Sequence, residues 1–204
     1  MSRLFILLVF SIAAFSAKAD SAAILVFGDS ISAGFGLADV EAGWVALLQS
    51  KLKDEGYGYR VINASVSGET TAGGLARLPR ALALHHPRLV ILELGGNDGL
   101  RALPIAPMRA NLAKMVELSR EAGASVLLLG MRMPPNYGPE YTEEFRSTYS
   151  VLGRELTVPV VPFLLNDIAL NAGLMQADGI HPNELGQARL LANVWPVLKP
   201  LLRK

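Results

Sequence analysis

The stretch AAILVFGDS, residues 22–30, joins a continuous apolar run directly to a glycine and two polar residues. Short runs of this kind, rich in Val, Ile and Leu and without polar alternation, are typical of strands buried on both faces of a parallel sheet. Four further runs of similar character follow, with enough chain between them for a helix. The five predicted strands are residues 22–27, 59–62, 89–94, 125–129 and 158–161.

Amphipathic helical patterns fill most of the intervals between these strands. Apolar side chains recur at helical spacing over residues 44–52, 108–119, 141–156 and 191–198. The last of these helices is preceded by Asn183, a residue type favoured at helix N-caps. Gly73, Gly74 and Pro79 predict that a helix after Gly68 is shortened or bent. The alternation predicts one α/β domain with helices on both faces of a five-stranded parallel sheet.

The first 19 residues have the pattern of a secretory signal peptide. Arg3 precedes an apolar segment, residues 4–15, and Ala17-Lys18-Ala19 supplies a small-residue cleavage signal. The apolar segment is too short to span a bilayer comfortably. We therefore expect cleavage near Ala19 and a periplasmic or secreted domain comprising residues 20–204.

Composition excludes several classes of function. The 204-residue chain has a formal charge of +1, which becomes −1 without Arg3 and Lys18, so no basic surface for nucleic acid is indicated. The absence of cysteine excludes a thiol nucleophile and disulfides, and three scattered histidines make a zinc site unexpected. We expect no metal, no organic cofactor, no stable membrane insertion and a monomer.

Three polar motifs follow predicted strands. Gly28-Asp29-Ser30 comes after the first strand, Gly95-Gly96-Asn97-Asp98 after the third, and Asp178-Gly179-Ile180-His181 after the fifth. In doubly wound sheets, ligands bind beyond the carboxyl ends of the strands, where the strand order reverses. With the flavodoxin-like order 2-1-3-4-5, Ser30 and Asn97 are neighbours at that point, and Gly68 borders the same crevice.

These residue types are the parts of a serine hydrolase. A serine is a poor nucleophile unless a base lies within hydrogen-bond reach, and His181 is the natural base. Asp178 can accept the Nδ1–H of His181 and fix its tautomer. The N–H groups of Ser30 and Gly68 and the amide of Asn97 could stabilise an oxyanion. Taken singly, each motif could also be an ordinary turn or helix cap.

Other ionisable residues have simpler interpretations. His85 and His86 precede a proline at a predicted helix end, which favours a structural role. Glu93 lies inside the third predicted strand and is expected to be a buried, hydrogen-bonded carboxyl group, with a helper role left open. Asp29 and Asp98 flank the reactive residues and are expected to support them by hydrogen bonds rather than transfer protons.

Together these motifs resemble those of the SGNH (GDSL-type) hydrolase family. The match covers Gly28-Asp29-Ser30-Ile31, Gly68, Gly95-x-Asn97-Asp98 and Asp178-x-x-His181, with no departure at these positions. The resemblance extends to the periplasmic thioesterases, lysophospholipases and arylesterases of that family. It implies a three-layer α/β/α fold, a Ser30-His181-Asp178 triad and an oxyanion hole of Ser30, Gly68 and Asn97.

The sequence therefore predicts a serine esterase or thioesterase that acts on acyl esters, including aryl esters, lysophospholipids and acyl thioesters, through an acyl-serine intermediate. Two apolar loops, residues 99–107 and 131–139, are expected to wall an acyl groove. Its predicted lining residues are Leu100, Arg101, Leu103, Ile105, Met133, Pro134, Tyr137 and Ile180. Two alternatives remain open: a carbohydrate acetylesterase on the same scaffold, and a non-catalytic periplasmic binding module that uses the same crevice.

Overall fold

A five-stranded parallel sheet forms the centre of the molecule. The computed structural model describes residues 22–204, and the predicted signal peptide, residues 1–19, lies outside them. The sheet order is β2-β1-β3-β4-β5, and every neighbouring pair is parallel. The predicted order 2-1-3-4-5 is confirmed. The strands are β1 (Ala22–Gly28), β2 (Tyr59–Asn63), β3 (Leu89–Glu93), β4 (Ser125–Leu129) and β5 (Val160–Val161).

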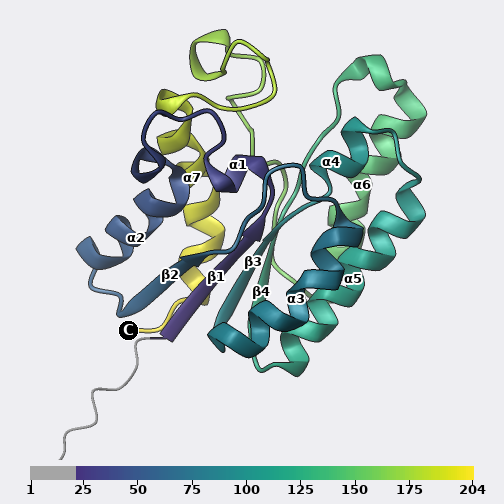
Figure 1. Ribbon diagram of the computed structural model, residues 1–204. Coiled ribbons are helices and arrows are strands. Elements are labelled where there is room, and N and C mark those ends of the chain that lie inside the picture. The colour runs from purple at the N-terminus through teal and green to yellow at the C-terminus, as the bar shows by residue number, and fades with distance from the viewer. Residues whose placement is uncertain (1–21) are drawn as a thin grey trace, which may run out of the picture.

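Helices cover both faces of the sheet and complete a three-layer α/β/α fold (Figure 1). Helices α2 and α7 pack together on one face, while α3, α5 and α6 pack in a row on the other. The helices are α1 (Ser30–Ala33), α2 (Trp44–Asp54), α3 (Thr71–His85), α4 (Gly96–Leu100), α5 (Ile105–Glu121), α6 (Pro139–Glu155) and α7 (Glu184–Leu198), with short 3-10 turns η1 (Val40–Ala42), η2 (Pro135–Tyr137), η3 (Ala172–Leu174) and η4 (Lys199–Leu201).

The core forms where the predicted apolar patterns meet. Residues 24–27 of β1 have no exposed surface, and the buried faces of the flanking helices pack against them. The predicted N-cap of α7 is confirmed, because the side chain of Asn183 accepts a hydrogen bond from the Gly186 N–H. Within residues 22–204, none of the helices combines the length and apolar character needed to cross a bilayer.

The expectation of a shortened helix after Gly68 is wrong. Helix α3 runs over 15 residues and continues through Pro79, which lies on its exposed side. A Cβ atom at Gly74 would lie 2.5 Å from Cδ1 of Leu94. Gly74 is therefore a site of close approach between α3 and the end of β3, and it does not break the helix.

The predicted loop over residues 99–107 is also largely helical. Helix α4 extends to Leu100 and α5 begins at Ile105, so only residues 101–104 connect them. The carboxyl ends of β1 and β3 thus lead directly into the short helices α1 and α4, which lie side by side at one edge of the sheet (Figure 1).

Candidate active site

Ser30 is the first residue of the short helix α1, two positions after β1 ends. Asp29 is the N-cap, and its Oδ1 accepts a hydrogen bond from the Ile31 N–H at 3.0 Å. Gly34 ends the helix in the left-handed conformation, with φ of 75°. This tight connection presents the Ser30 hydroxyl beyond the carboxyl end of β1.

A continuous chain of hydrogen bonds joins Ser30, His181 and Asp178. The Ser30 Oγ atom lies 2.8 Å from Nε2 of His181, across 151 residues of sequence. Nδ1 of His181 lies 2.6 Å from Oδ2 of Asp178, whose Oδ1 accepts the N–H groups of Ile180 and His181. The structure thus brings together the three residues that the sequence predicted would meet.

The long segment between β5 and α7 carries His181 and Asp178. Leu164, Ile168 and Met175 anchor the segment because their side chains are buried in the core. Met175 and Pro182 form an antiparallel bridge, and the Gln176 N–H donates to the carbonyl of His181 at 2.8 Å. A segment held in this way at both ends can fix the direction of the imidazole ring.

Hydrogen bonds keep Asp178 ionised. Partial burial opposes ionisation, but the hydrogen bonds from the His181 ring and from two backbone N–H groups outweigh it and lower the pKa of Asp178 to about 2. Asp178 is therefore a carboxylate across the neutral and mildly acidic range. An ionised acceptor on Nδ1 directs the lone pair of His181 Nε2 toward Ser30.

Asn97 and Gly68 follow the two strands that flank β1. Asn97 comes after β3, and Gly68 comes after β2. Asn97 is in α4, and its side-chain amide donates to Oδ2 of Asp29 at 3.1 Å, which leaves one amide hydrogen. Gly68 has φ of 78°, and its carbonyl accepts a hydrogen bond from Arg101 at 3.0 Å. Among the residues that the structure describes, the N–H groups of Ser30 and Gly68 donate to no protein atom.

Two buried carboxyl groups lie beneath these residues. Glu93 has no exposed surface, and its Oε2 accepts hydrogen bonds from the Ser32 hydroxyl at 2.7 Å and the Asp29 N–H at 3.2 Å. Complete burial and the neighbouring charge of Asp29 raise the pKa of Glu93 well above its usual range. Burial also raises the pKa of Asp29 to about 6, against opposing hydrogen bonds from Ile31 and Asn97. With a pKa of about 6, Asp29 is mainly the carboxylate at neutral pH, while burial favours the protonated form of Glu93.

We expect Asp29→Asn to change the pH dependence of stability. The folded-state pKa of about 6 lies above the ordinary value of 3.8 for an aspartate, so folding favours the protonated form, and stability is lost as pH rises from about 4 through about 6. The shift corresponds to about 3 kcal/mol, a cost present at neutral pH and absent below about pH 4. Asparagine cannot ionise, so the free energy of unfolding of Asp29→Asn, relative to the natural protein, should improve between pH 4 and pH 7 in denaturant titrations.

Asp39→Asn is the matched control. Asp39 also caps a helical turn, since its Oδ1 accepts the N–H of the residue two positions later at 2.9 Å, but it is exposed to solvent. Its substitution should leave the difference between pH 4 and pH 7 nearly unchanged. A stability difference for Asp29→Asn that did not vary with pH would show that Asp29 is not a costly buried charge.

Position 28 has no room for a side chain, because Glu93 packs directly against the backbone of Gly28. The two residues are register partners on β1 and β3, and a Cβ atom at position 28 would lie 2.5 Å from Oε2 of Glu93 and 3.0 Å from its carbonyl oxygen. Neither atom has free space, because Glu93 is fully buried. We expect Gly28→Ala to lower the free energy of unfolding by about 1–3 kcal/mol through overpacking, measured by denaturant titration.

Gly58→Ala is the control for this effect. An added Cβ atom at Gly58 would meet no atom within 4 Å. Its stability should therefore stay close to that of the natural protein. Equal stability losses in the two variants would contradict the close approach of Glu93 to Gly28.

The predicted acyl-groove residues divide into exposed and buried groups. The hydroxyl of Tyr137 donates to the carbonyl of Leu100 at 2.9 Å, which joins the two predicted loops. Ile105 and Met133 are only 6% and 9% exposed and belong to the core, so they do not form an open wall as expected. The predicted residues with surface available are Leu100, Arg101, Leu103, Pro134, Tyr137 and Ile180.

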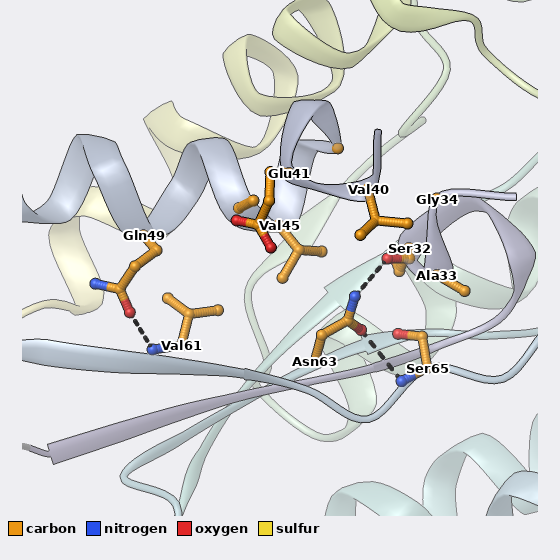
Figure 2. Close-up of a pocket in the computed structure, with 12 residues that line it drawn as sticks. Ser32, Ala33, Gly34, Val40, Glu41, Val45, Gln49, Val61, Asn63 and Ser65 are labelled. Carbon is orange, nitrogen blue, oxygen red and sulfur yellow. Dashed lines mark hydrogen bonds between the residues drawn. The ribbon is translucent and has the colours of Figure 1, made fainter. Parts of the chain in front are cut away.

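A separate cavity of about 420 Å³ lies between α1, η1, α2 and β2. Figure 2 shows the Asn63 side chain directed toward Ser32, with Ser65 beside it, among the residues that line the cavity. The Asn63 amide donates to the carbonyl of Ser32 at 2.8 Å. Ser30, Asp178 and His181 do not line this cavity, and its polar contacts brace α1 from the side of the edge strand.

Sequence reasoning missed two residues that contact the site. The Phe35 ring lies against the His181 ring, with centroids 4.6 Å apart, and Gln176 donates to the carbonyls of Phe35 and Pro182. No local pattern signals either residue, because the contacts that join Phe35 to His181 and to Gln176 connect segments far apart in sequence. In the described part of the chain, no three His, Asp or Glu side chains gather as a metal site would require.

Comparisons with known proteins show which family this chain belongs to. Residues 26–189 match the model of the GDSL-like lipase/acylhydrolase family. The chain is 56% identical over 185 residues to esterase TesA from Pseudomonas aeruginosa, covering 91% of this chain and 92% of that protein. It is 41% identical over 187 residues to thioesterase 1/protease 1/lysophospholipase L1 from Escherichia coli K12, covering 92% of this chain and 87% of that protein.

A solved structure has the same fold along most of the chain. The crystal structure of TesA superposes with a TM-score of 0.86 at 57% sequence identity, covering 88% of this chain and 99% of that one. The family match spans most of the chain and includes all three segments that carry Ser30, Asn97 and His181. The chain therefore belongs to the GDSL-like lipase/acylhydrolase family.

Proposed function

We propose that this protein is a serine hydrolase that cleaves acyl esters and acyl thioesters through an acyl-Ser30 intermediate. The single observation that supports this most is the unbroken contact from Ser30 Oγ to His181 Nε2 and from His181 Nδ1 to Asp178. The relatives bear the names esterase and thioesterase/lysophospholipase, which favours the same reaction class.

The proposed reaction has two halves. Ser30 Oγ attacks the acyl carbonyl carbon while His181 Nε2 takes its proton, and Asp178 stabilises the resulting imidazolium. His181 then gives that proton to the departing alcohol or thiol as the bond to the acyl carbon breaks. Water then attacks the acyl carbon while His181 takes its proton, and His181 returns that proton to Ser30 Oγ as the acyl–oxygen bond breaks, which releases the acid and the free serine.

The proposed oxyanion hole consists of the N–H groups of Ser30 and Gly68 and the amide of Asn97. Within residues 22–204, neither of the two N–H groups donates to a protein acceptor, which supports this role. The ionised Asp29 accepts one amide hydrogen of Asn97 in a charge-assisted hydrogen bond, which fixes the orientation of the amide and so holds its other hydrogen in one direction. The buried charge of Asp29 is unfavourable for stability, but it orients Asn97, which is proposed to stabilise the transition state.

The proposed acyl site lies beside α4 and the 131–139 loop. Leu100, Leu103 and Tyr137 offer partly exposed apolar surface there. The Tyr137 hydroxyl joins the loop to α4 through the carbonyl of Leu100, and the hydroxyl of Tyr141 on α6 donates to the carbonyl of Leu103. Arg101 donates a hydrogen bond to the carbonyl of Gly68 and so places a positive charge next to that residue. We also propose that residues 1–19 direct export and that the catalytic domain, residues 20–204, acts as a monomer in the periplasm or outside the cell.

A substrate panel tests the proposal. We expect the purified domain to hydrolyse p-nitrophenyl esters from acetyl to decanoyl, along with a lysophospholipid and an acyl-CoA. Acetylated xylan should be a poor substrate, because the exposed residues near α4 are mainly apolar. A strong preference for the acetylated polysaccharide would favour a carbohydrate acetylesterase. Folded protein with no turnover on any ester would instead indicate a binding module.

A further inference from the structure

The structure assigns Phe35 as a specificity-determining residue: its ring forms the platform on which the leaving group rests, and it favours esters whose alcohol portion is aromatic. This inference rests on the proposed function of Ser30 and His181. It concerns a residue outside every motif that the sequence analysis singled out.

Phe35 is held rigidly between the nucleophile segment and the base segment. Its N–H donates to the carbonyl of Ser30 at 3.0 Å, and its own carbonyl accepts from the Gln176 side chain at 2.7 Å. Gln176 also donates its backbone N–H to the carbonyl of His181. The backbone of Phe35 is therefore fixed with respect to both reacting side chains.

The side chain that this anchoring presents is open to solvent. Phe35 is 50% exposed, while its ring lies 4.6 Å from the His181 ring at an interplanar angle of 43°. A single exposed apolar residue is ordinary on a protein surface. Phe35 is different, because its ring is half exposed and both of its backbone groups are anchored beside His181. Little conformational entropy is therefore lost at this residue when a ligand binds.

The position of Phe35 identifies the part of the substrate that it meets. His181 Nε2 protonates the leaving group, so the first atoms of that group must lie within hydrogen-bond distance of Nε2. The acyl side lies toward α4, and the segment after α1 that carries Phe35 runs away from α4 (Figure 1). A leaving group that reaches His181 and points away from the acyl site therefore passes over the Phe35 ring.

An aromatic leaving group gains most from such a platform. Two rings in offset or tilted contact attract each other beyond their shared apolar area. Replacing Phe35 with leucine keeps an apolar side chain but removes this ring contact. The selectivity for aryl over alkyl esters should fall by about 3- to 10-fold, the range expected from one aromatic pair.

Matched acetate esters measure this selectivity. Phenyl acetate and hexafluoroisopropyl acetate share the acyl group and have leaving groups of similar acidity, but only the first is aromatic. The ratio of their kcat/KM values reports the acylation step, in which the leaving group is still present. We expect Phe35→Leu to lower this ratio about 3- to 10-fold and Phe35→Tyr, which keeps the ring, to retain it.

Leu170→Ala is the control. Leu170 is a fully exposed apolar residue on the same long segment as His181. Its replacement by alanine should leave the ratio of the two kcat/KM values unchanged. An unchanged ratio in Phe35→Leu, or an equal fall in Leu170→Ala, would overturn the assignment of Phe35.

Labelling with a fluorophosphonate separates this inference from the proposed function. The reagent loses fluoride, so its reaction with Ser30 does not involve an aromatic leaving group. Labelled Ser30 with an unchanged ester ratio would overturn the role of Phe35 alone. Folded natural protein that is not labelled would overturn the proposed function and, with it, the role of Phe35.

Discussion

Ser30→Ala should lower the turnover of p-nitrophenyl butyrate by about five to six orders of magnitude, which is the scale seen when a catalytic serine is removed from a serine hydrolase. Alanine cannot form the acyl-enzyme, and no cysteine is present to replace it. The fold should persist, because His181 is the only partner of the Ser30 hydroxyl among residues 22–204. Initial rates and circular dichroism on the same preparation measure both effects.

Ser67→Ala is the matched control for this substitution. Ser67 is an exposed serine in the neighbouring segment that leads to Gly68. Its loss should leave turnover within about a factor of two, as for a surface substitution with no partner. Retention of more than a few per cent of activity in Ser30→Ala would mean that another group attacks the ester.

Asn97→Ala should lower kcat by about 10²- to 10³-fold with little change in KM. The remaining amide hydrogen of Asn97 is proposed to stabilise the oxyanion, which exists only near the transition state. An interaction of this kind affects kcat more than substrate binding. Steady-state kinetics with a single aryl ester separates the two parameters.

Asn111→Ala provides the comparison. Asn111 is also partly buried and donates one side-chain hydrogen bond at 3.1 Å, to the hydroxyl of Thr71, but it lies on α5. Its kcat should change far less than that of Asn97→Ala. A rise in KM alone for Asn97→Ala would contradict the oxyanion role and indicate a ground-state contact.

Much of the fold follows from the sequence because local signals and tertiary structure agree. The continuous apolar runs become the parallel strands, and Asn183 caps α7 as predicted. Helix α3 differs, because its Gly74 serves a contact with Leu94 that no local pattern reveals. The strand predicted over residues 158–161 has only two residues, Val160 and Val161, that pair with β4 in the sheet. Val158 is buried but does not pair with a neighbouring strand.

The site follows the same division. Ser30, Asn97 and His181 could be placed together because each follows a strand end, and parallel strands bring those ends to one edge. Phe35 and Gln176 could not, because their contact spans 141 residues and depends on how two loops pack. Ile105 was expected in the groove because apolar residues look alike in sequence, whether they face a ligand or the core.

The pair of buried carboxyl groups illustrates how stability and function oppose each other here. The charge of Asp29 is costly to bury, and a neutral residue would remove that cost. Asn97 is the residue that gains from the charge, through the hydrogen bond at 3.1 Å. The stability of Asp29→Asn relative to the natural protein should therefore be greater at neutral pH than in acid. Its kcat should be lower than that of the natural protein.

Intact-mass spectrometry after exposure to a fluorophosphonate tests the central claim most directly. The domain comprising residues 20–204 should gain one phosphonyl group, peptide mapping should place it on Ser30, and Ser30→Ala should gain none. His181→Ala should react far more slowly, because the base that activates Ser30 is missing. A folded protein that acquired no adduct, or an adduct that persisted in Ser30→Ala, would contradict Ser30 as the nucleophile.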